Sequence, residues 1–194
     1  MKKIDFFEQY RSRCEKCNNG ERVLIPKPDE KNGFVGAKIM FINERPGRVG
    51  PGETGFVSFD NSDPSARRFK ELFSLINIPR KDIFITNTCL WYPDDPNYTD
   101  TPPNIVSSVP ILQDQIQTIK PLLIVAVGGT ALKALKMIFK ESKQLRNHRL
   151  SDVGKVINDT NPIIYPVYHT SNRAGITRSF EEQKKDWRMM AKFL

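Results

Sequence analysis

The chain has few of the residues that mark disulfide-rich, metal-dependent or membrane proteins. Its 194 residues include only two histidines and three cysteines, and an odd cysteine count argues against a disulfide scaffold. No apolar run approaches the roughly 20 residues that cross a bilayer, and the first residues lack the apolar core of a signal peptide. We therefore expect a cytoplasmic protein with no membrane contact.

Acidic residues are also scarce relative to basic ones. The chain has 22 Asp and Glu against 30 Lys and Arg, which gives a formal net charge of +8. Such a balance favours a polyanionic partner, nucleic acid first. A basic soluble protein without such a partner is the alternative that charge alone leaves open.

Apolar strand-like runs alternate with amphipathic segments, which is the pattern of an α/β fold. Neither an internal repeat nor a linker interrupts it, so we expect residues 1–194 to form one domain, a three-layer α/β/α sandwich with a central, mostly parallel four-stranded sheet. The predicted strands are 37–43, 83–87, 122–127 and 163–168. The predicted helices are 4–13, about three turns from Pro64, a segment that opens at Thr101-Pro102, 131–140 and 179–194. In the segment that opens at Thr101-Pro102, Pro110 kinks the helix or delays its start. The predicted loops include 46–63, 90–104 and the basic segment 143–149.

Polar residues follow the predicted strands. Glu44 comes after the first, Asn87 ends the second, and His169 comes after the fourth. Because ligands bind at the carboxyl edge of open α/β sheets, these side chains are candidates for one site. An amide that both donates and accepts, with a phenylalanine-bearing loop above it, suits a planar heterocycle.

Five short motifs occur in order and carry a resemblance to a known family. They resemble the Gly-Glu-Ala-Pro-Gly, Pro-Phe-Val, Ile-Thr-Asn, Val-Ala-Leu-Gly-x-Thr-Ala and His-Pro-x-x-x motifs of the uracil-DNA glycosylase superfamily, closest to its family-four, iron–sulfur type. In this chain they read Asn43-Glu44-Arg45-Pro46-Gly47, Gly55-Phe56-Val57, Ile85-Thr86-Asn87, Val125-Ala126-Val127-Gly128-Gly129-Thr130-Ala131 and His169-Thr170-Ser171-Asn172-Arg173.

The resemblance implies hydrolysis of an N-glycosidic bond after a base is flipped out of DNA. By that resemblance, Phe56 stacks on the base, with Phe59 as a competitor for this role, and Asn87 reads the Watson–Crick edge. His169 donates a hydrogen bond to O2 of the leaving base, and Glu44 positions or activates water. The protein is then expected to act as a monomer on single-stranded or duplex DNA.

Other residues are assigned to the base pocket and to DNA by the same resemblance. Gly47 leaves an open wall that fits a 5-substituted pyrimidine, and Arg45 lies beside it in the substrate-binding motif. Arg173, with its motif neighbours Ser171 and Asn172, fills the gap in the stack or binds phosphate. Of the remaining candidates, His148 lies in the basic loop, where we expect a surface or phosphate-facing residue.

Departures from the family pattern leave the reaction open. Arg45 occupies the slot of a small residue in family four and of a water-activating Asp in other families, and a guanidinium is no base. Either Glu44 alone organises the water, or the chemistry is altered or lost. The first alternative is a DNA glycosylase acting on uracil, hypoxanthine or a modified pyrimidine. The second is a catalytically altered or inactive DNA-binding module of the same fold, and a third is action on a free nucleoside.

The family's iron–sulfur cluster requires four cysteines, and two of the four are absent here. Cys14 and Cys17 reproduce its Cys-x-x-Cys pair, but Trp91 aligns with the third ligand and Ser108 with the fourth. Cys89 lies two residues before the third position. We therefore expect no cluster and no other cofactor, with Cys14, Cys17 and Cys89 as only weak candidates for binding a metal such as zinc.

Overall fold

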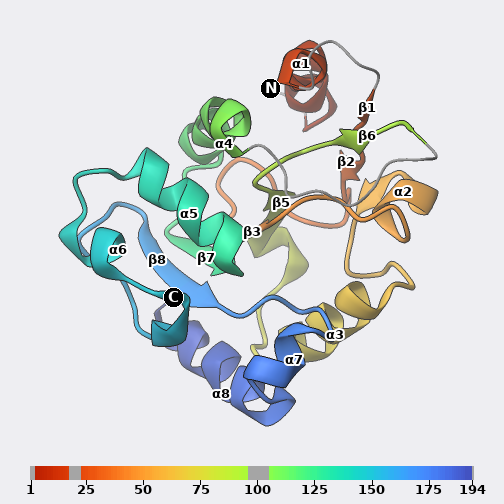
Figure 1. Ribbon diagram of the computed structural model, residues 1–194. Helices are drawn as coiled ribbons and strands as arrows, with labels where there is room; N and C mark the ends of the chain where they lie inside the picture. Colours follow the sequence, from red (N-terminus) through yellow and green to blue (C-terminus); the bar gives the residue numbers. More distant parts are fainter. Residues whose placement is uncertain (1–2, 18–22, 96–104, 194) are drawn as a thin grey trace.

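The protein is built on a four-stranded sheet in which all neighbouring strands are parallel (Figure 1). The computed structural model describes residues 3–17, 23–95 and 105–193. The sheet order is β5-β3-β7-β8, and helices lie on both sides of it, which confirms the predicted three-layer α/β/α fold. The strands are β3 (Ile39–Asn43), β5 (Ile83–Asn87), β7 (Leu123–Val127) and β8 (Ile163–Val167).

Alternating residues of the strands build two separate apolar layers. Met40 and Ile42 of β3 pack with α4 (Ile105–Ile119) and α5 (Gly129–Ile138). Ile39 and Phe41 pack on the opposite face with α3 (Pro64–Phe73) and α8 (Phe180–Met190). Because successive side chains of a strand point to opposite faces, a strand buried on both sides needs an unbroken apolar run, as this sequence has.

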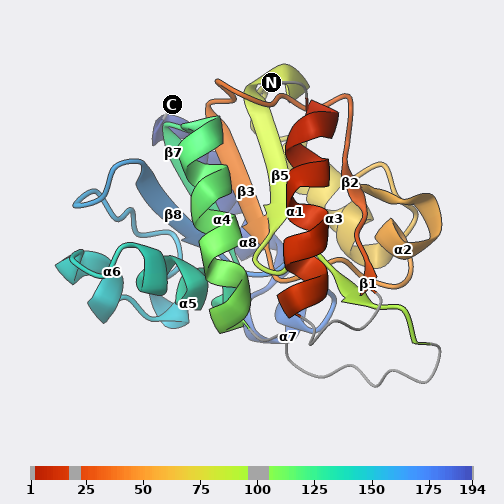
Figure 2. The ribbon, with the colours of Figure 1, turned by 90° about the horizontal axis from the view of Figure 1, so that it is seen from above.

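The amino-terminal helix adds a smaller cluster beside the sheet (Figure 2). Helix α1 (Lys3–Cys17) is longer than the predicted 4–13 and includes both cysteines of the Cys-x-x-Cys pair. Phe6, Tyr10 and Cys14, spaced four residues apart, share one helix face and are buried with Trp91. This continuous apolar face carries the helix past residue 13.

Capping explains where two further helices begin. Asp63 Oδ1 accepts hydrogen bonds from the N–H groups of Ser65 and Ala66, so α3 begins at Asp63-Pro64 as predicted. The segment predicted as a basic loop instead contains α6 (Lys143–Asn147). Ser142 Oγ accepts from Leu145 N there, at 2.9 Å, and Leu145 is fully buried. A capping serine and one buried leucine therefore outweighed the loop-like composition.

The remaining elements are short. The predicted loop 46–63 contains α2 and β4, and the last helix ends at Met190 before one 3₁₀ turn. Pro110 lies inside α4, while the predicted start of that helix at 101–102 lies outside the described residues. These elements are β1 (Val23–Leu24), β2 (Lys27–Pro28), α2 (Pro51–Thr54), β4 (Phe56–Val57), β6 (Tyr92–Pro93), α7 (Ala174–Thr177) and the 3₁₀ turns Arg80–Asp82, Leu150–Asp152 and Ala191–Phe193.

The order of strands reverses between β3 and β7. The chain moves from β3 to its neighbour β5 on one side, then crosses to β7 on the other side and on to β8. A crevice forms at such a reversal, outside the carboxyl ends of the strands. Glu44 directly follows β3 at this point. No helix of the described part of the chain is long and apolar enough to span a membrane.

Candidate active site

Glu44 follows β3, and its side chain is held by a residue that follows β7, the neighbouring strand on the other side of the reversal point. The Thr130 hydroxyl, in the first turn of α5, donates a hydrogen bond to Oε2 of Glu44. The main-chain carbonyl of Glu44 accepts from Cys89 N at 3.0 Å. These two bonds fix a half-buried carboxylate at the edge of the sheet, as its position after a strand predicts.

His169, two residues after β8, is held in one tautomer. Ser171 N donates a hydrogen bond to its Nδ1 at 3.0 Å, so a neutral ring carries its proton on Nε2. Burial lowers the pKa of His169, although the carboxylates of Glu44 and Asp63 act in the opposite direction. The imidazole is therefore neutral at pH 7 and offers Nε2–H as a hydrogen-bond donor.

Gly128 makes room for this histidine at the end of β7. Its φ of +90° lies in the region that side chains other than glycine rarely adopt. A Cβ at this position would also lie 3.2 Å from Cβ of His169. Gly128 thus allows the end of β7 and the loop that carries His169 to approach each other closely.

Asn87 ends β5 at the floor of a small cleft that also reaches His169. We call it the inner cleft: its volume is about 180 Å³, and Arg45, Gly47, Phe59, Asp63, Asn87 and His169 are among the residues that line it. Asn87 is 3% exposed, and its Nδ2 has no hydrogen-bond partner among the described residues. A buried donor left unpaired is costly, so this amide is a candidate to bind an acceptor atom of a ligand.

Phe56, which is predicted to stack on the base, does not line the inner cleft. This residue is 38% exposed and lines a separate hollow with Thr54 and Asn61. Phe59, the predicted competitor, lines the inner cleft instead. It packs against Phe69, with ring centroids 5.6 Å apart, and the Arg80 guanidinium lies 4.2 Å from its ring centroid.

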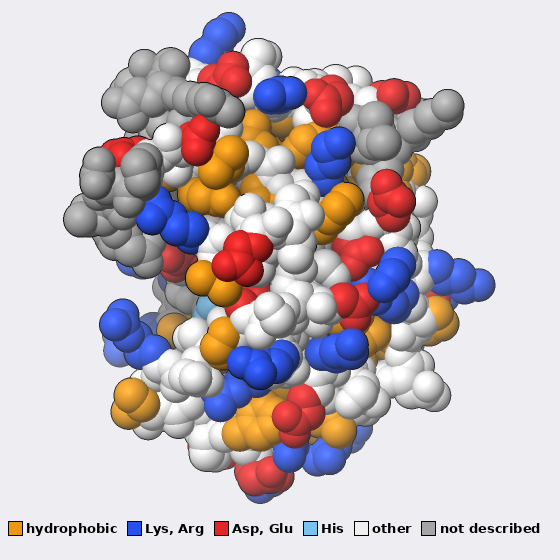
Figure 3. Space-filling model, turned by 90° about the vertical axis from the view of Figure 1, so that its right-hand side faces the viewer, with side chains coloured by type: hydrophobic (Ala, Val, Ile, Leu, Met, Phe, Trp, Pro, Cys, Tyr) orange, Lys and Arg blue, Asp and Glu red, His pale blue; other side chains and the backbone are white. Residues whose placement is uncertain are grey.

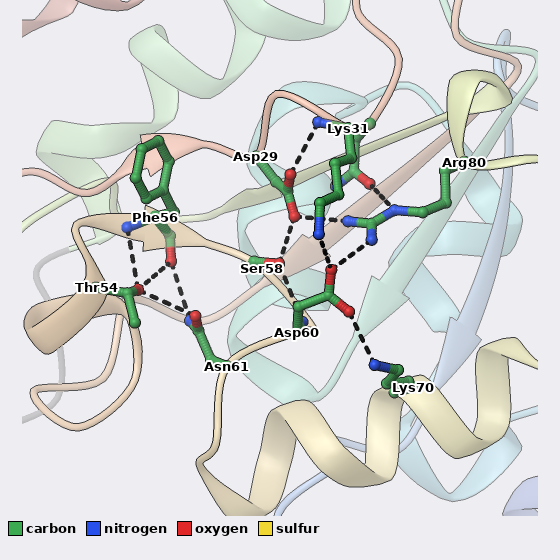
Figure 4. A network of polar contacts seen from close by, with 10 residues as sticks. Asp29, Lys31, Thr54, Phe56, Ser58, Asp60, Asn61, Lys70 and Arg80 are labelled. Atoms are coloured by element: carbon green, nitrogen blue, oxygen red, sulfur yellow. Dashed lines mark hydrogen bonds and ion pairs between the residues drawn. The ribbon is translucent and has the colours of Figure 1, made fainter.

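A network of charges anchors the loop that carries Phe59 (Figure 4). Asp60 accepts hydrogen bonds from Lys31, Lys70 and Arg80, which hold the pKa of its carboxyl far below the usual range, Arg80 most of all. Arg80 also bonds Asp29 at 2.6 Å. Figure 4 shows the Phe56 ring turned away from this network. Next to Phe59, the loop is therefore bound to segments that are distant from it in the sequence.

A second, larger cleft adjoins the inner one. This outer cleft, of about 720 Å³, shares Arg45 and His169 with the inner cleft and is also lined by Glu44, Tyr92, Arg48, Ser171 and Arg173. It is thus lined by three arginines as well as by Glu44. On the face in Figure 3, Lys and Arg side chains are scattered among Asp and Glu.

The residues predicted to contact DNA are distributed unequally. Ser171 and Arg173 line the outer cleft, whereas Asn172 is exposed and lines neither cleft. His148 was expected at the surface but is 8% exposed, with its Nε2 buried and unpartnered among the described residues. It follows α6, which folds the supposed basic loop onto the protein and so buries this ring.

The two histidines predict how stability depends on pH. Burial lowers the pKa of both His148 and His169, so each binds a proton more weakly in the folded than in the unfolded state. The stabilisation is complete above the unfolded pKa of about 6.5 and is lost as the pH falls through and below it. We expect urea denaturation to give a smaller free energy of unfolding at pH 5.5 than at pH 7.5.

The His148→Gln variant should show a smaller loss between these two pH values than the wild-type protein. Carboxylates with lowered pKa values, such as that of Asp60, lose their contribution only below this window. An unfolding free energy that is equal or larger at pH 5.5 would contradict the prediction.

The three cysteines lie together in the small cluster beside α1, where Cys14 and Cys89 are buried and Cys17 packs against them. Burial raises the pKa of Cys14 to about 12 and also raises that of Cys89, so both are protonated thiols. Cys17 Sγ donates to the carbonyl of Ser107, and Trp91, at the expected third ligand, packs in the core. No group of three or more His, Cys, Asp or Glu among the described residues is arranged to hold a metal ion.

Two residues of the site went unnoticed in the sequence. Thr130 stands within a quoted motif, but the hydrogen bond to Glu44 depends on the neighbouring positions of β3 and β7. Asp63 caps α3, but it also lines the inner cleft. Its closeness in sequence to Phe59 was the one available signal for that second role.

Comparison with known proteins places this geometry in a family. The model of the family described as "Uracil DNA glycosylase superfamily" matches residues 31–191, which is most of the chain. The matched region contains both clefts and every strand of the central sheet. Among curated proteins, none matches the chain.

Proposed function

Because the chain belongs to the uracil-DNA glycosylase superfamily, we propose that it is a DNA glycosylase that hydrolyses the N-glycosidic bond of a flipped-out uracil or modified pyrimidine. The observation that carries this proposal is the unpaired, buried Nδ2 of Asn87 in the same cleft as His169. A pyrimidine O4 supplies the missing acceptor. The cleft is smaller than the roughly 300 Å³ of typical drug-sized pockets, which suits a single ring.

The chemistry follows from the state of His169. As the bond between the sugar C1′ and the base N1 breaks, negative charge develops on the base. The neutral His169 donates a hydrogen bond from Nε2–H to O2 of that base, which stabilises the charge while the imidazole keeps its proton. Water then forms the new bond to C1′, oriented by the Glu44 carboxylate, and its proton ends on the departing base.

The walls of the inner cleft assign the other contacts. Phe59 provides the aromatic surface against the base, in the role first assigned to Phe56. Gly47 lines the same cleft with no side chain. A base that carries a substituent therefore has more room beside this turn than it would have if a larger residue replaced Gly47.

The outer cleft receives the DNA strand next to the extruded nucleotide. Arg45, Arg48 and Arg173 line it and would contact phosphates, so we expect affinity to fall steeply as salt rises. Extruding a base costs a few kcal/mol, which contacts in both clefts offset. We propose that the reaction needs no cluster or metal, because Trp91 and Ser108 replace two of the cysteines that a cluster would use.

A base-release assay tests the proposal. The protein is incubated with single-stranded and duplex oligonucleotides that each carry one uracil, hypoxanthine or 5-substituted pyrimidine, and abasic products are cleaved with alkali. We expect cleavage at the modified position of at least one pyrimidine substrate. If every oligonucleotide of the panel stays intact at high protein concentration, the proposed glycosylase activity is refuted.

Arg45 supports one other candidate, a DNA-binding module of the same fold without catalysis. Its guanidinium-bearing side chain lines both clefts, in a motif position that holds a water-activating Asp in other families. This candidate predicts salt-dependent DNA binding without base release. If Arg45 displaced the chemistry, Arg45→Ala should restore some cleavage, and no gain would count against this candidate.

A further inference from the structure

Arg68 of α3 connects this helix to the loop that follows His169. Its Nη1 donates a hydrogen bond to the carbonyl oxygen of Ser171 at 3.0 Å. Ser171 is also the residue whose N–H donates to Nδ1 of His169, again at 3.0 Å. The guanidinium and the imidazole are therefore bound to the carbonyl and the N–H of one and the same residue.

The surroundings of Arg68 hold its guanidinium against this loop. Helices α3, α7 and α8 lie beside one another (Figure 1), and the guanidinium approaches the other two. Its central carbon is 5.0 Å from the ring centroid of Phe180 in α8. In α7, a Cβ on Gly175 would come within 3.1 Å of Nη1, so this glycine leaves space for the guanidinium. Among the described residues, no carboxylate forms an ion pair with Arg68, and its hydrogen-bond acceptor is the Ser171 carbonyl.

Arg68 does not touch a base bound in the inner cleft. It lines neither cleft, although Ala66 and Phe69 of the same helix line the inner one and Ser171 lines the outer one. Any effect of Arg68 on the reaction therefore passes through the loop. The hydrogen bond at one ring nitrogen of a neutral histidine decides which nitrogen carries the proton, so the place of the Ser171 N–H matters for His169.

We propose that Arg68 is a positioning residue for the proposed base release. By binding the Ser171 carbonyl, it keeps the Ser171 N–H directed at Nδ1 of His169, and the Nε2–H of the same ring directed at the base. Without the guanidinium the loop gains conformations in which Nδ1 loses its donor, and the ring then also adopts the Nδ1–H tautomer and other orientations. Only the effect on the rate rests on the proposed function; the effect on the ring does not.

Nitrogen NMR of the imidazoles tests the effect on the ring. The chain has two histidines, so the signals of His169 and His148 are readily assigned. At pH 7.5, wild-type His169 should show an unprotonated Nδ1 and a protonated Nε2. Arg68→Met keeps an apolar stem beside Phe180 but has no donor. It should move the two nitrogen shifts of His169 towards each other and leave those of His148 unchanged.

Single-turnover base release measures the effect on the reaction. Arg68→Met should lower the rate constant at saturating protein about tenfold, because the donor is less well oriented. The protein concentration that gives half the maximal rate should change by less than about threefold, since Arg68 does not contact the substrate. Arg68→Lys retains a donor for the carbonyl and should recover most of the rate and the wild-type shifts.

Two further variants complete the design. Arg67→Met makes the same replacement at an exposed neighbour in α3 that lines neither cleft, so it should behave as the wild-type protein. Arg68→Gln carries a side chain too short to reach the Ser171 carbonyl. It should repeat the effects of Arg68→Met, and it replaces that variant if circular dichroism shows that Arg68→Met does not fold.

The outcomes separate this inference from the proposed function. If the His169 shifts of the folded variant equal those of the wild type, or if the His148 shifts move equally, Arg68 does not position the ring and the inference is wrong. An unchanged rate in a variant of an active wild type also overturns the inference, while the glycosylase stands. If the wild-type protein releases no base, the proposed function fails, and the nitrogen shifts alone decide whether Arg68 positions His169.

Discussion

Replacing His169 with alanine is expected to slow base release by about two to three orders of magnitude, the usual cost of removing one donor from a developing oxyanion. The ring is neutral, its proton is directed to Nε2 by the Ser171 N–H, and it lines both clefts. Alanine removes the donor and leaves the charge on the departing base without its partner. Single-turnover rates on the best substrate of the panel measure the effect free of product release.

The same measurement on Ile176→Ala serves as the control. This side chain is 88% exposed, lies in α7 close to the His169 loop, and lines neither cleft. Its rate should stay close to that of the wild-type protein. A His169→Ala rate within about threefold of wild type, with the fold intact by circular dichroism, would remove His169 from the proposed mechanism.

The second large effect concerns stability and does not depend on the proposed reaction. Trp187 of α8 is 1% exposed; its ring stacks on Phe41 with centroids 5.4 Å apart and meets Phe69 edge-on at 5.0 Å. Trp187→Ala removes the largest side chain between this helix and the sheet. We expect a loss of about 3–5 kcal/mol in the free energy of unfolding.

Urea denaturation measures that loss, which is a large share of the 5–15 kcal/mol typical of a whole protein. Met189→Ala provides the comparison, because this neighbour in α8 is 44% exposed and should cost well under 1 kcal/mol. If both variants unfold at the same urea concentration, the packing of α8 against β3 does not contribute as the structure indicates.

The regular elements could be predicted because their signals are local. The unbroken apolar runs of β3 and β7 identify strands buried on both faces, and the Asp63-Pro64 pair marks the beginning of α3. Where the prediction was wrong, the local signals of the segment pointed to a different structure from the one that forms. Residues 143–147 look like a basic loop, and α6 is stabilised by the Ser142 cap together with the contacts of buried Leu145 with the rest of the core.

The candidate site was predictable to the extent that it lies at strand ends. Glu44, Asn87 and His169 follow parallel strands of one sheet, so the sheet itself brings them to one edge. Side chains on the connecting loops have no such constraint. Their positions depend on contacts between distant segments, such as those of Asp60 with Lys31 and Arg80.

By itself, the sequence determined the α/β architecture, the family resemblance and the strand-end residues of the site, because periodicity and motif order are properties of neighbouring residues. Only the tertiary structure decided that Phe59 rather than Phe56 lines the inner cleft, that His148 is buried, and that the cap residue Asp63 faces the same cleft as His169. The physical reason is that loop side chains are placed by long-range ion pairs and packing, and these exist only once the sheet and its helices have assembled.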